Sequence, residues 1–272
     1  MWHKLLCLLT VTAMALCTCH CGGGQSIFST SRGIPDTNTP GGNSVANTFN
    51  DIQSGPGWNG YALLPPSYHI CESCSPAGPE ATWSTEQGVT SPSLSGGAMR
   101  FNLGGSKPFA DILWNVKFTK RLPDEKMVPR LHNFTYDLSF FGADLETSQA
   151  LEFDINQFFA GKSFIWGHEC RIAGGHEWDT WDNVNKHWVK SGIACNPANN
   201  AWNHLTIRVQ RTSDDRLLFQ SITLNGVTHT LNRYDNPSST TWYGLTVNYQ
   251  MDGNRNQQPY TVYLDKFNFT YF

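Results

Sequence analysis

Acidic and amide residues alternate with apolar residues in the stretch 150–157, where the polar positions are Glu152, Asp154 and Asn156. In a β-strand this spacing places the polar side chains on one face and the apolar side chains on the other. Carboxylate and amide groups hydrogen-bond sugar hydroxyls, and a positioned pair of carboxyl groups can cleave a glycosidic bond. The stretch therefore predicts a sheet surface that faces a saccharide, and it leaves open whether that surface binds or cuts.

A second polar row comes from the segment Tyr243–Met251, in which Asn248 and Gln250 alternate with apolar residues. The alternation again predicts a strand with one polar face. We include both amides among the expected ligand-binding residues, because an amide offers a sugar hydroxyl both donors and acceptors.

Tryptophans are concentrated between residues 166 and 188, with acids, amides and histidines between them. Indole faces stack on the apolar C–H faces of pyranose rings, and the interleaved polar groups hydrogen-bond hydroxyls. The side chains that we expect to contact a ligand from this segment are Trp166, His168, Trp178, Asp179, Trp181 and Trp188. The alternative is that single tryptophans fill the protein core. Parity on a strand over 163–170 puts Trp166 and His168 on one face, and the pairing register decides whether that face is the face of Glu152.

Short alternating segments separated by turn signals indicate an all-β chain. The expected strands are Asn133–Phe141, Ala150–Phe158, Ser163–Cys170, Trp202–Gln210, Leu217–Leu224, Val227–Leu231, Tyr243–Met251 and Pro259–Phe272. We expect the first three to be neighbours, and Asn225-Gly226 to form a hairpin turn. No stretch has a convincing helical pattern. Many short strands at this spacing predict a sandwich or jelly roll of two antiparallel sheets, formed by one domain over 46–272.

Charge is sparse and nearly balanced, at 15% charged residues and a formal net charge of -3, whereas 13% of the residues are aromatic and ten are Trp. Nothing in this balance favours electrostatic capture of nucleic acid or of an anionic membrane. Nucleic acid is therefore not an expected partner, and a membrane is expected only through a possible lipid anchor. The sequence does not predict an oligomeric state.

The first 21 residues resemble a secretory leader, because Lys4 precedes a short apolar run that ends near Leu16. Cys21 and the glycines after it resemble the lipidated cysteine and tether of a bacterial lipoprotein, although His20 stands where a small residue is usual. Ordinary cleavage and release is the alternative. Residues 22–45 are rich in Gly, Ser, Thr and Pro and read as a flexible linker. We therefore expect an exported protein, secreted or lipid-anchored at the cell envelope.

Cysteines of an exported domain are expected to pair. Cys170 and Cys195 bracket the Trp-rich segment, which we expect to be a long loop. A disulfide between them would stabilise the fold by about 3 kcal/mol on the chain-entropy estimate. Cys71 and Cys74 are close enough for a tight disulfide, with half of a metal site as the alternative. No other cofactor is expected with certainty. Asp265 is a candidate ligand of a structural calcium ion, and the alternative is a simple surface Asp.

Four segments carry a resemblance to a known group of proteins: Gly88–Gly97, Leu151–Gln157, Tyr249–Gly253 and Val262–Lys266. They resemble exported bacterial proteins of the concanavalin A-like jelly-roll type, common in soil Acidobacteria. The resemblance covers most of residues 49–272, and it implies a fold and a compartment more than an activity.

The segment from Glu152 to Ile155 is similar to the strand motif of laminarinase-like glycoside hydrolases. This similarity implies that Glu152 would be the nucleophile and Asp154 its helper, if the protein is an enzyme. Asn156 stands where that motif has its acid/base Glu, and an amide cannot donate the proton. The acid would then come from elsewhere, with Glu169, Glu177 and Asp179 as candidates.

The sequence favours an exported lectin-like protein that binds polysaccharide on a Trp-rich, acid-lined sheet face, because a binding site needs no positioned proton donor. Two alternatives stay open. The first is a glycan-cleaving enzyme that uses Glu152, as a retaining glycoside hydrolase or, with less support, a polysaccharide lyase. The second is a structural envelope protein without a glycan ligand.

Overall fold

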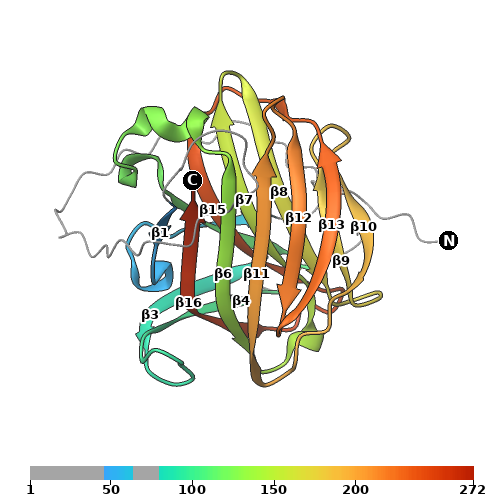
Figure 1. Ribbon diagram of the computed structural model, residues 1–272. Helices are drawn as coiled ribbons and strands as arrows, with labels where there is room; N and C mark the ends of the chain where they lie inside the picture. The colour runs from blue at the N-terminus through green and yellow to red at the C-terminus, as the bar shows by residue number, and fades with distance from the viewer. Residues whose placement is uncertain (1–45, 64–79) are drawn as a thin grey trace.

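The computed structural model describes residues 46–63 and 80–272, and these form two eight-stranded antiparallel sheets that pack face to face (Figure 1). Sheet A has the order β13 (Val227–Asp235), β12 (Leu217–Leu224), β11 (Ala201–Arg211), β6 (Asn133–Gly142), β16 (Tyr260–Tyr271), β4 (Ala98–Gly104) and β3 (Thr82–Val89), with β1 (Asn47–Phe49) paired to β16. Sheet B has the order β10 (His187–Ala194), β9 (Glu177–Asp182), β8 (Lys162–Arg171), β7 (Ser148–Phe159), β15 (Gly244–Gly253), β5 (Asp111–Lys117) and β2 (Asn59–Leu63), with β14 (Ser238–Ser239) paired to β8.

Helical structure within the described residues consists of short 3-10 turns. They are η1 (Ile52–Ser54), η2 (Thr119–Arg121), η3 (Glu125–Arg130) and η4 (Leu145–Thr147). None of the helices in this part of the chain is long and apolar enough to span a bilayer. The predicted all-β fold, a jelly-roll sandwich of two antiparallel sheets, is confirmed.

Two expectations about the arrangement of strands were wrong. β6 was expected beside β7, but it lies in sheet A between β11 and β16, while β7 pairs with β8 and β15 in sheet B. The segment between Cys170 and Cys195 was expected to be a long loop, but it contains the strands β9 and β10. Alternation in that segment is obscured by tryptophans on both faces of β9, because Trp178 faces the core and Trp181 faces away from it.

Apolar side chains of both sheets fill the space between them. Phe134, Tyr136 and Phe269 from sheet A meet Phe153 and Trp166 from sheet B in this core. These rings are at most 1% exposed. Because alternate residues of a strand point to opposite sides, filling the core with one set forces the other set of sheet B onto its outer face.

A disulfide joins Cys170 on β8 to Cys195 at the end of β10, as predicted. It closes a segment of 25 residues that contains all of β9 and β10. Both cysteines are fully buried, so the bond fixes the outer hairpin of sheet B to the core. The estimate of about 3 kcal/mol for a loop of this length still applies.

Candidate functional site

The outer face of sheet B carries a set of polar side chains that we call the polar face. Its members are Asp111, Asn115, Glu152, Asp154, Asn156, Glu169, Asp179, Thr246, Asn248, Gln250 and Asp252. Each is no more than 9% exposed. The expected residues Glu152, Asp154, Asn156, Asn248 and Gln250 therefore do share one surface.

Strand register arranges the polar face in rows. In one row Gln250 lies opposite Glu152, which lies opposite Glu169, which lies opposite Asp179. In the next row Asn115 lies opposite Asn248 and Asn248 opposite Asp154. Directly opposed residues have Cβ atoms about 4.5–5.5 Å apart, so each row is a continuous line of polar groups across neighbouring strands.

Hydrogen bonds connect part of this set. Asn248 Nδ2 donates to Asp154 Oδ2 at 3.3 Å, and Gln250 Nε2 donates to Asp252 Oδ1 at 2.8 Å. The side chain of Glu152 is a neighbour of Asp252, and this contact lowers the pKa of the Asp252 carboxyl.

Other atoms of the polar face have no hydrogen-bond partner although they are buried. The oxygens are Asn115 Oδ1, Asp154 Oδ1, Asn156 Oδ1, Asn248 Oδ1 and Gln250 Oε1, and the indole nitrogen Nε1 of Trp181 joins them. A buried polar atom without a partner costs about 1–3 kcal/mol. Five such oxygens on one face are acceptors for the hydroxyl donors of a ligand or of ordered water.

Burial raises the pKa values of two acids on this face. For Asp154, burial is the largest influence, donors at Asn248 and the His168 amide act against it, and the pKa lies at about 7. For Asp252, burial again dominates over hydrogen bonds from Gln250 and Glu152, and the pKa lies at about 6. Both groups therefore hold a proton over part of the range in which ordinary Asp side chains are ionised.

Two tryptophans stand beside Asp154. Trp181 on β9 lies opposite Trp188 on β10, and their rings meet edge to face with centroids 5.2 Å apart. Gly167, the β8 residue opposite Asp154, makes room for them. A Cβ at Gly167 would lie 2.9 Å from Trp181 Cβ and 3.2 Å from Trp188 Cη2. Trp181 and Trp188, both expected to contact a ligand, therefore lie beside Asp154, and their role in binding stays a prediction.

Three other residues expected to bind a ligand do not lie on this face. Trp166, His168 and Trp178 are at most 1% exposed and point between the sheets, because β8 pairs with β7 in the register that opposes His168 to Phe153. The His168 ring lies 5.2 Å from the ring of Phe219, and burial lowers its pKa to about 3. The prediction was wrong for these three residues, which belong to the protein core.

Arg171 distinguishes between the three candidate proton donors. Its guanidinium donates to Asp179 at 2.8 Å and to Glu177 at 2.5 Å, so both carboxylates take part in a partly buried ion-pair network. Glu169 lies directly opposite Glu152 on the neighbouring strand. Glu169 is therefore the best placed of the three relative to Glu152.

Sequence reasoning missed Asp111, Asn115 and Asp252. It placed Thr246 in the same alternation as Asn248 and Gln250 but did not count it among the ligand-binding residues. A usable signal existed for Asp252, because the alternation that identified Asn248 and Gln250 continues to it. No comparable signal existed on β5, where Leu113 occupies the position between Asp111 and Asn115.

Asp265 has a role that requires no cation. Its side chain is fully buried and accepts hydrogen bonds from Ser93 Oγ, from the amides of Leu94 and Ser95, from Ser95 Oγ, from Gln53 Nε2 and from the Lys266 amide. The alternative of a simple surface Asp is wrong because the side chain is buried, whereas the structural calcium ion stays a prediction. Within residues 46–63 and 80–272, no group of three or more His, Cys, Asp or Glu side chains is arranged to hold a metal ion.

Cys21, Cys71 and Cys74 lie outside the described residues, so the predicted lipidation and the predicted Cys71–Cys74 disulfide stay predictions.

No protein-family model matches the sequence, and no curated protein sequence matches it. Several solved structures have a similar arrangement of strands. One comes from work on the promiscuous specificity of carbohydrate-binding modules of the β-sandwich superfamily, and it aligns at 10% identity and a TM-score of 0.40, covering 81% of this chain and 60% of that chain. Arcelin-5, a lectin-like defence protein from Phaseolus vulgaris, aligns at 9% identity and a TM-score of 0.40, covering 80% of this chain and 99% of that chain. An alginate lyase aligns at 12% identity and a TM-score of 0.40, covering 65% and 81% of the two chains.

Proposed function

We propose that this protein is an exported lectin-like protein that binds polysaccharide on the outer face of sheet B. The observation that carries the proposal is the set of unpartnered acceptor oxygens on Asn115, Asp154, Asn156, Asn248 and Gln250. Sugar hydroxyls donate hydrogen bonds in closely spaced sets, and closely spaced acceptors complement them. An amide can also turn to present its NH2 group, so the same residues serve hydroxyls that accept.

The tryptophan pair supplies the second element of a sugar site. Trp188 is half-buried, and its ring contacts the ring of Trp181. The Trp188 ring also lies over Gly167, the residue opposite Asp154. An indole at this place offers apolar area to the C–H face of a sugar ring while the acidic row binds its hydroxyls. Polar acceptors beside an aromatic platform favour a saccharide over a purely apolar ligand.

Replacing Trp188 with Ala is expected to weaken retention on insoluble polysaccharide about 10-fold, a change of about 1.4 kcal/mol. The physical reason is the loss of stacking area with no loss of core packing. The measurement is a pull-down with β-glucans, mannans, xylans and uronans under oxidising conditions. Trp202→Ala is the matched control, because Trp202 is also half-buried but lies on sheet A against Phe141. Equal losses in both variants would contradict the proposal.

Glycan cleavage is a second candidate function, and a specific observation favours it. Glu152 neighbours Asp252 and lies opposite Glu169 on β8, so carboxyl groups that could serve as the acid are nearby although Asn156 cannot donate the proton. Retaining hydrolysis needs two carboxyl groups about 5–5.5 Å apart. Glu152 and Glu169 are directly opposed, so their Cβ atoms are about 4.5–5.5 Å apart, which is close to the separation that the two carboxyl groups need.

If the protein cleaves glycans, Glu152→Gln is expected to abolish the release of reducing or unsaturated ends while polysaccharide retention persists. Gln keeps the shape of Glu but cannot act as a nucleophile. The measurement is end-group release from the same polysaccharide panel. Retention without release by the unaltered protein would rule out this second function and leave the lectin. Neither retention nor release would leave a structural envelope protein.

A further inference from the structure

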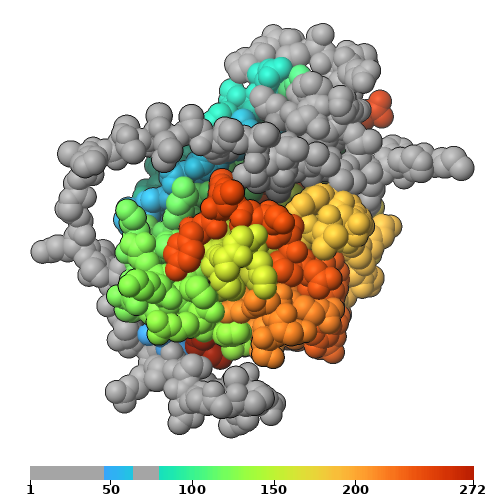
Figure 2. Space-filling view, turned by 90° about the horizontal axis from the view of Figure 1, so that it is seen from above, coloured from blue at the N-terminus to red at the C-terminus, as the bar shows by residue number. Residues whose placement is uncertain are grey.

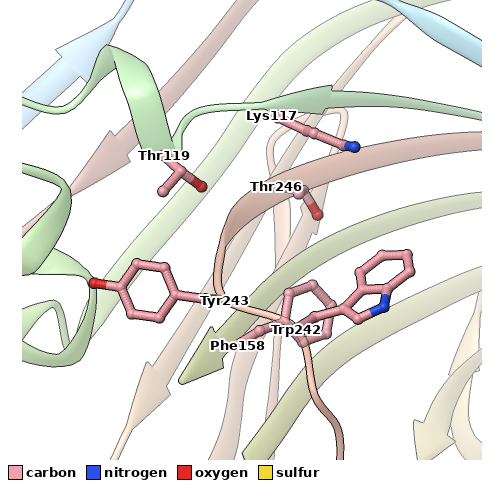
Figure 3. A pocket seen from close by; sticks show the side chains of 6 residues that line it. All are labelled: Lys117, Thr119, Phe158, Trp242, Tyr243 and Thr246. Atoms are coloured by element: carbon pink, nitrogen blue, oxygen red, sulfur yellow. The ribbon is translucent and has the colours of Figure 1, made fainter. Parts of the chain in front are cut away.

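A pocket at one end of the polar face combines the cationic side chain of Lys117 with the exposed aromatic rings of Trp242 and Tyr243. Its volume is about 190 Å³, and it is lined by Lys117, Thr119, Phe158, Trp242, Tyr243 and Thr246 (Figure 3). A second pocket of about 410 Å³ shares Lys117, Thr119 and Tyr243 and adds Lys120, Arg121 and Glu125. The two pockets are adjacent because they share three residues.

Register makes this pocket an extension of the polar face. Lys117 lies opposite Thr246, and Thr246 lies opposite Asn156. Thr246 Oγ1 accepts a hydrogen bond from Asn156 Nδ2 at 3.2 Å. A chain of sugars that crosses Asp154 and Asn156 along β7 therefore reaches Lys117 and Trp242 next.

Charge in the pocket is opposite to charge on the polar face. Lys117 and Lys120 are exposed, and neither forms an ion pair within the described part of the chain. Arg121 is held by the Pro56 carbonyl and stacks on Phe118, so it contributes a positive field more than a free contact. Glu125 is the one carboxylate that lines either pocket. The pocket is therefore a net cationic site beside a region of acids.

The aromatic groups are held in place by the surrounding backbone. Trp242 is 42% exposed, and its ring meets Phe158 edge to face with centroids 5.7 Å apart. Its amide donates to Thr240 Oγ1, and the Thr240 amide donates to the Gly161 carbonyl. Tyr243 donates its hydroxyl hydrogen to the Glu125 carbonyl at 2.6 Å. From above, the segment 236–243 (red-orange) lies between the β7–β8 turn (yellow-green) and the segment 119–130 (green) (Figure 2).

We infer that this pocket binds an anionic sugar unit, so that the polysaccharide is an acidic one whose sugars carry carboxylate or sulfate groups. This inference rests on the proposed function, because the pocket takes the unit that follows those on the polar face. The Lys117 ammonium pairs with the anionic group, and the exposed indole of Trp242 packs on the ring of the same unit. The acids of the polar face repel an anion at their own position and so direct it to the cationic end.

The test compares polygalacturonate, dextran sulfate and a neutral β-glucan in affinity electrophoresis of the full protein at low and high salt. We expect at least one of the two anionic polymers, the carboxylate polymer or the sulfate polymer, to bind at least 10-fold more tightly than the neutral polymer at low salt. This difference should fall at high salt, because salt screens the charges. Lys117→Gln and Trp242→Ala are each expected to lower anionic binding about 10-fold. Both side chains are exposed, so neither substitution removes core packing.

Arg208→Gln is the matched control, because it also removes one exposed positive charge but lies on β11 of sheet A. It is expected to leave binding unchanged within about 2-fold. Equal effects of Arg208→Gln and Lys117→Gln would overturn the inference, since net charge alone would then explain them. Retention of the neutral glucan that depends on Trp188 but not on Lys117 would overturn the inference and leave the proposed function intact. Retention of no polymer would overturn both.

Discussion

Asp154→Asn is expected to stabilise the protein against unfolding above pH 7, by on the order of 2–4 kcal/mol. Burial raises the pKa of Asp154 to about 7, with a smaller contribution from the charge of Asp252. An ordinary Asp in the unfolded chain loses its proton near pH 4. When the Asp154 carboxyl ionises in the folded protein, its charge is buried away from water, whereas the same charge in the unfolded chain is solvated. The neutral side chain of Asn removes this buried charge.

The sign fixes the pH window of this effect. A folded pKa above the unfolded value means that the folded protein holds the extra proton between about pH 4 and pH 7. Stability from this group is fully present below about pH 4 and is lost as pH rises through about 7. The gain in Asp154→Asn should accordingly disappear on acidification to about pH 4.

The measurement is the free energy of unfolding in urea at a series of pH values between 4 and 8. Asp144→Asn is the control, because Asp144 is exposed and is expected to change stability by less than about 0.5 kcal/mol. An Asp154→Asn variant that is less stable than the unaltered protein at pH 8 would contradict the prediction. If Asp154→Asn is more stable but retains polysaccharide less well, Asp154 is a functional residue whose place in the fold lowers stability.

Alternation alone was enough to locate three of the strands that carry the site, namely β7, β8 and β15. β12 was predicted with its observed bounds, and β7 and β8 were predicted to within two residues at each end. The reason is that sheet B has one dry face and one polar face, so a period of two is visible in sequence. Strand pairing was not visible, because β7 meets β15, about ninety residues later in the chain, and no local signal records that partner.

The tryptophans illustrate the limit of sequence reasoning. Trp166 and Trp181 have similar surroundings in sequence, with acids and glycines nearby, yet Trp166 packs on Phe134 in the core and Trp181 lies on the polar face. The difference depends on one step of register between β8 and β9. Composition predicted an aromatic platform, and only the pairing of strands could say which indoles form it.

Asp265→Ala is expected to destabilise the protein by about 3–5 kcal/mol. The buried carboxylate accepts six hydrogen bonds, which join β16 to η1 and to the turn over residues 93–95. Removing it leaves the amides of Leu94, Ser95 and Lys266 without an acceptor. Two of the segments that carry the sequence resemblance, Gly88–Gly97 and Val262–Lys266, thus meet at this carboxylate.

Acid titration provides an independent measurement of the same interaction. Burial alone would raise the pKa of Asp265, but the donors of Ser95 and Ser93 outweigh it and lower the pKa to about 2. A folded pKa below the unfolded value contributes stability that is present above about pH 4 and is lost as pH falls through about 2. The unaltered protein should therefore lose roughly 2 kcal/mol of unfolding free energy in this window that Asp265→Ala does not lose.

Ser93→Ala separates the hydrogen-bond network from general packing. It removes one donor at 2.7 Å and leaves the other five, so it is expected to cost about 1 kcal/mol and to move the acid transition only slightly toward neutral pH. Calcium gives the deciding comparison. If adding Ca²⁺ or a chelator shifts the urea midpoint of the unaltered protein but not of Asp265→Ala, this carboxylate binds a cation after all. No shift in either protein, with the large loss in Asp265→Ala, is the result expected of a carboxylate whose acceptor sites are filled by the chain itself.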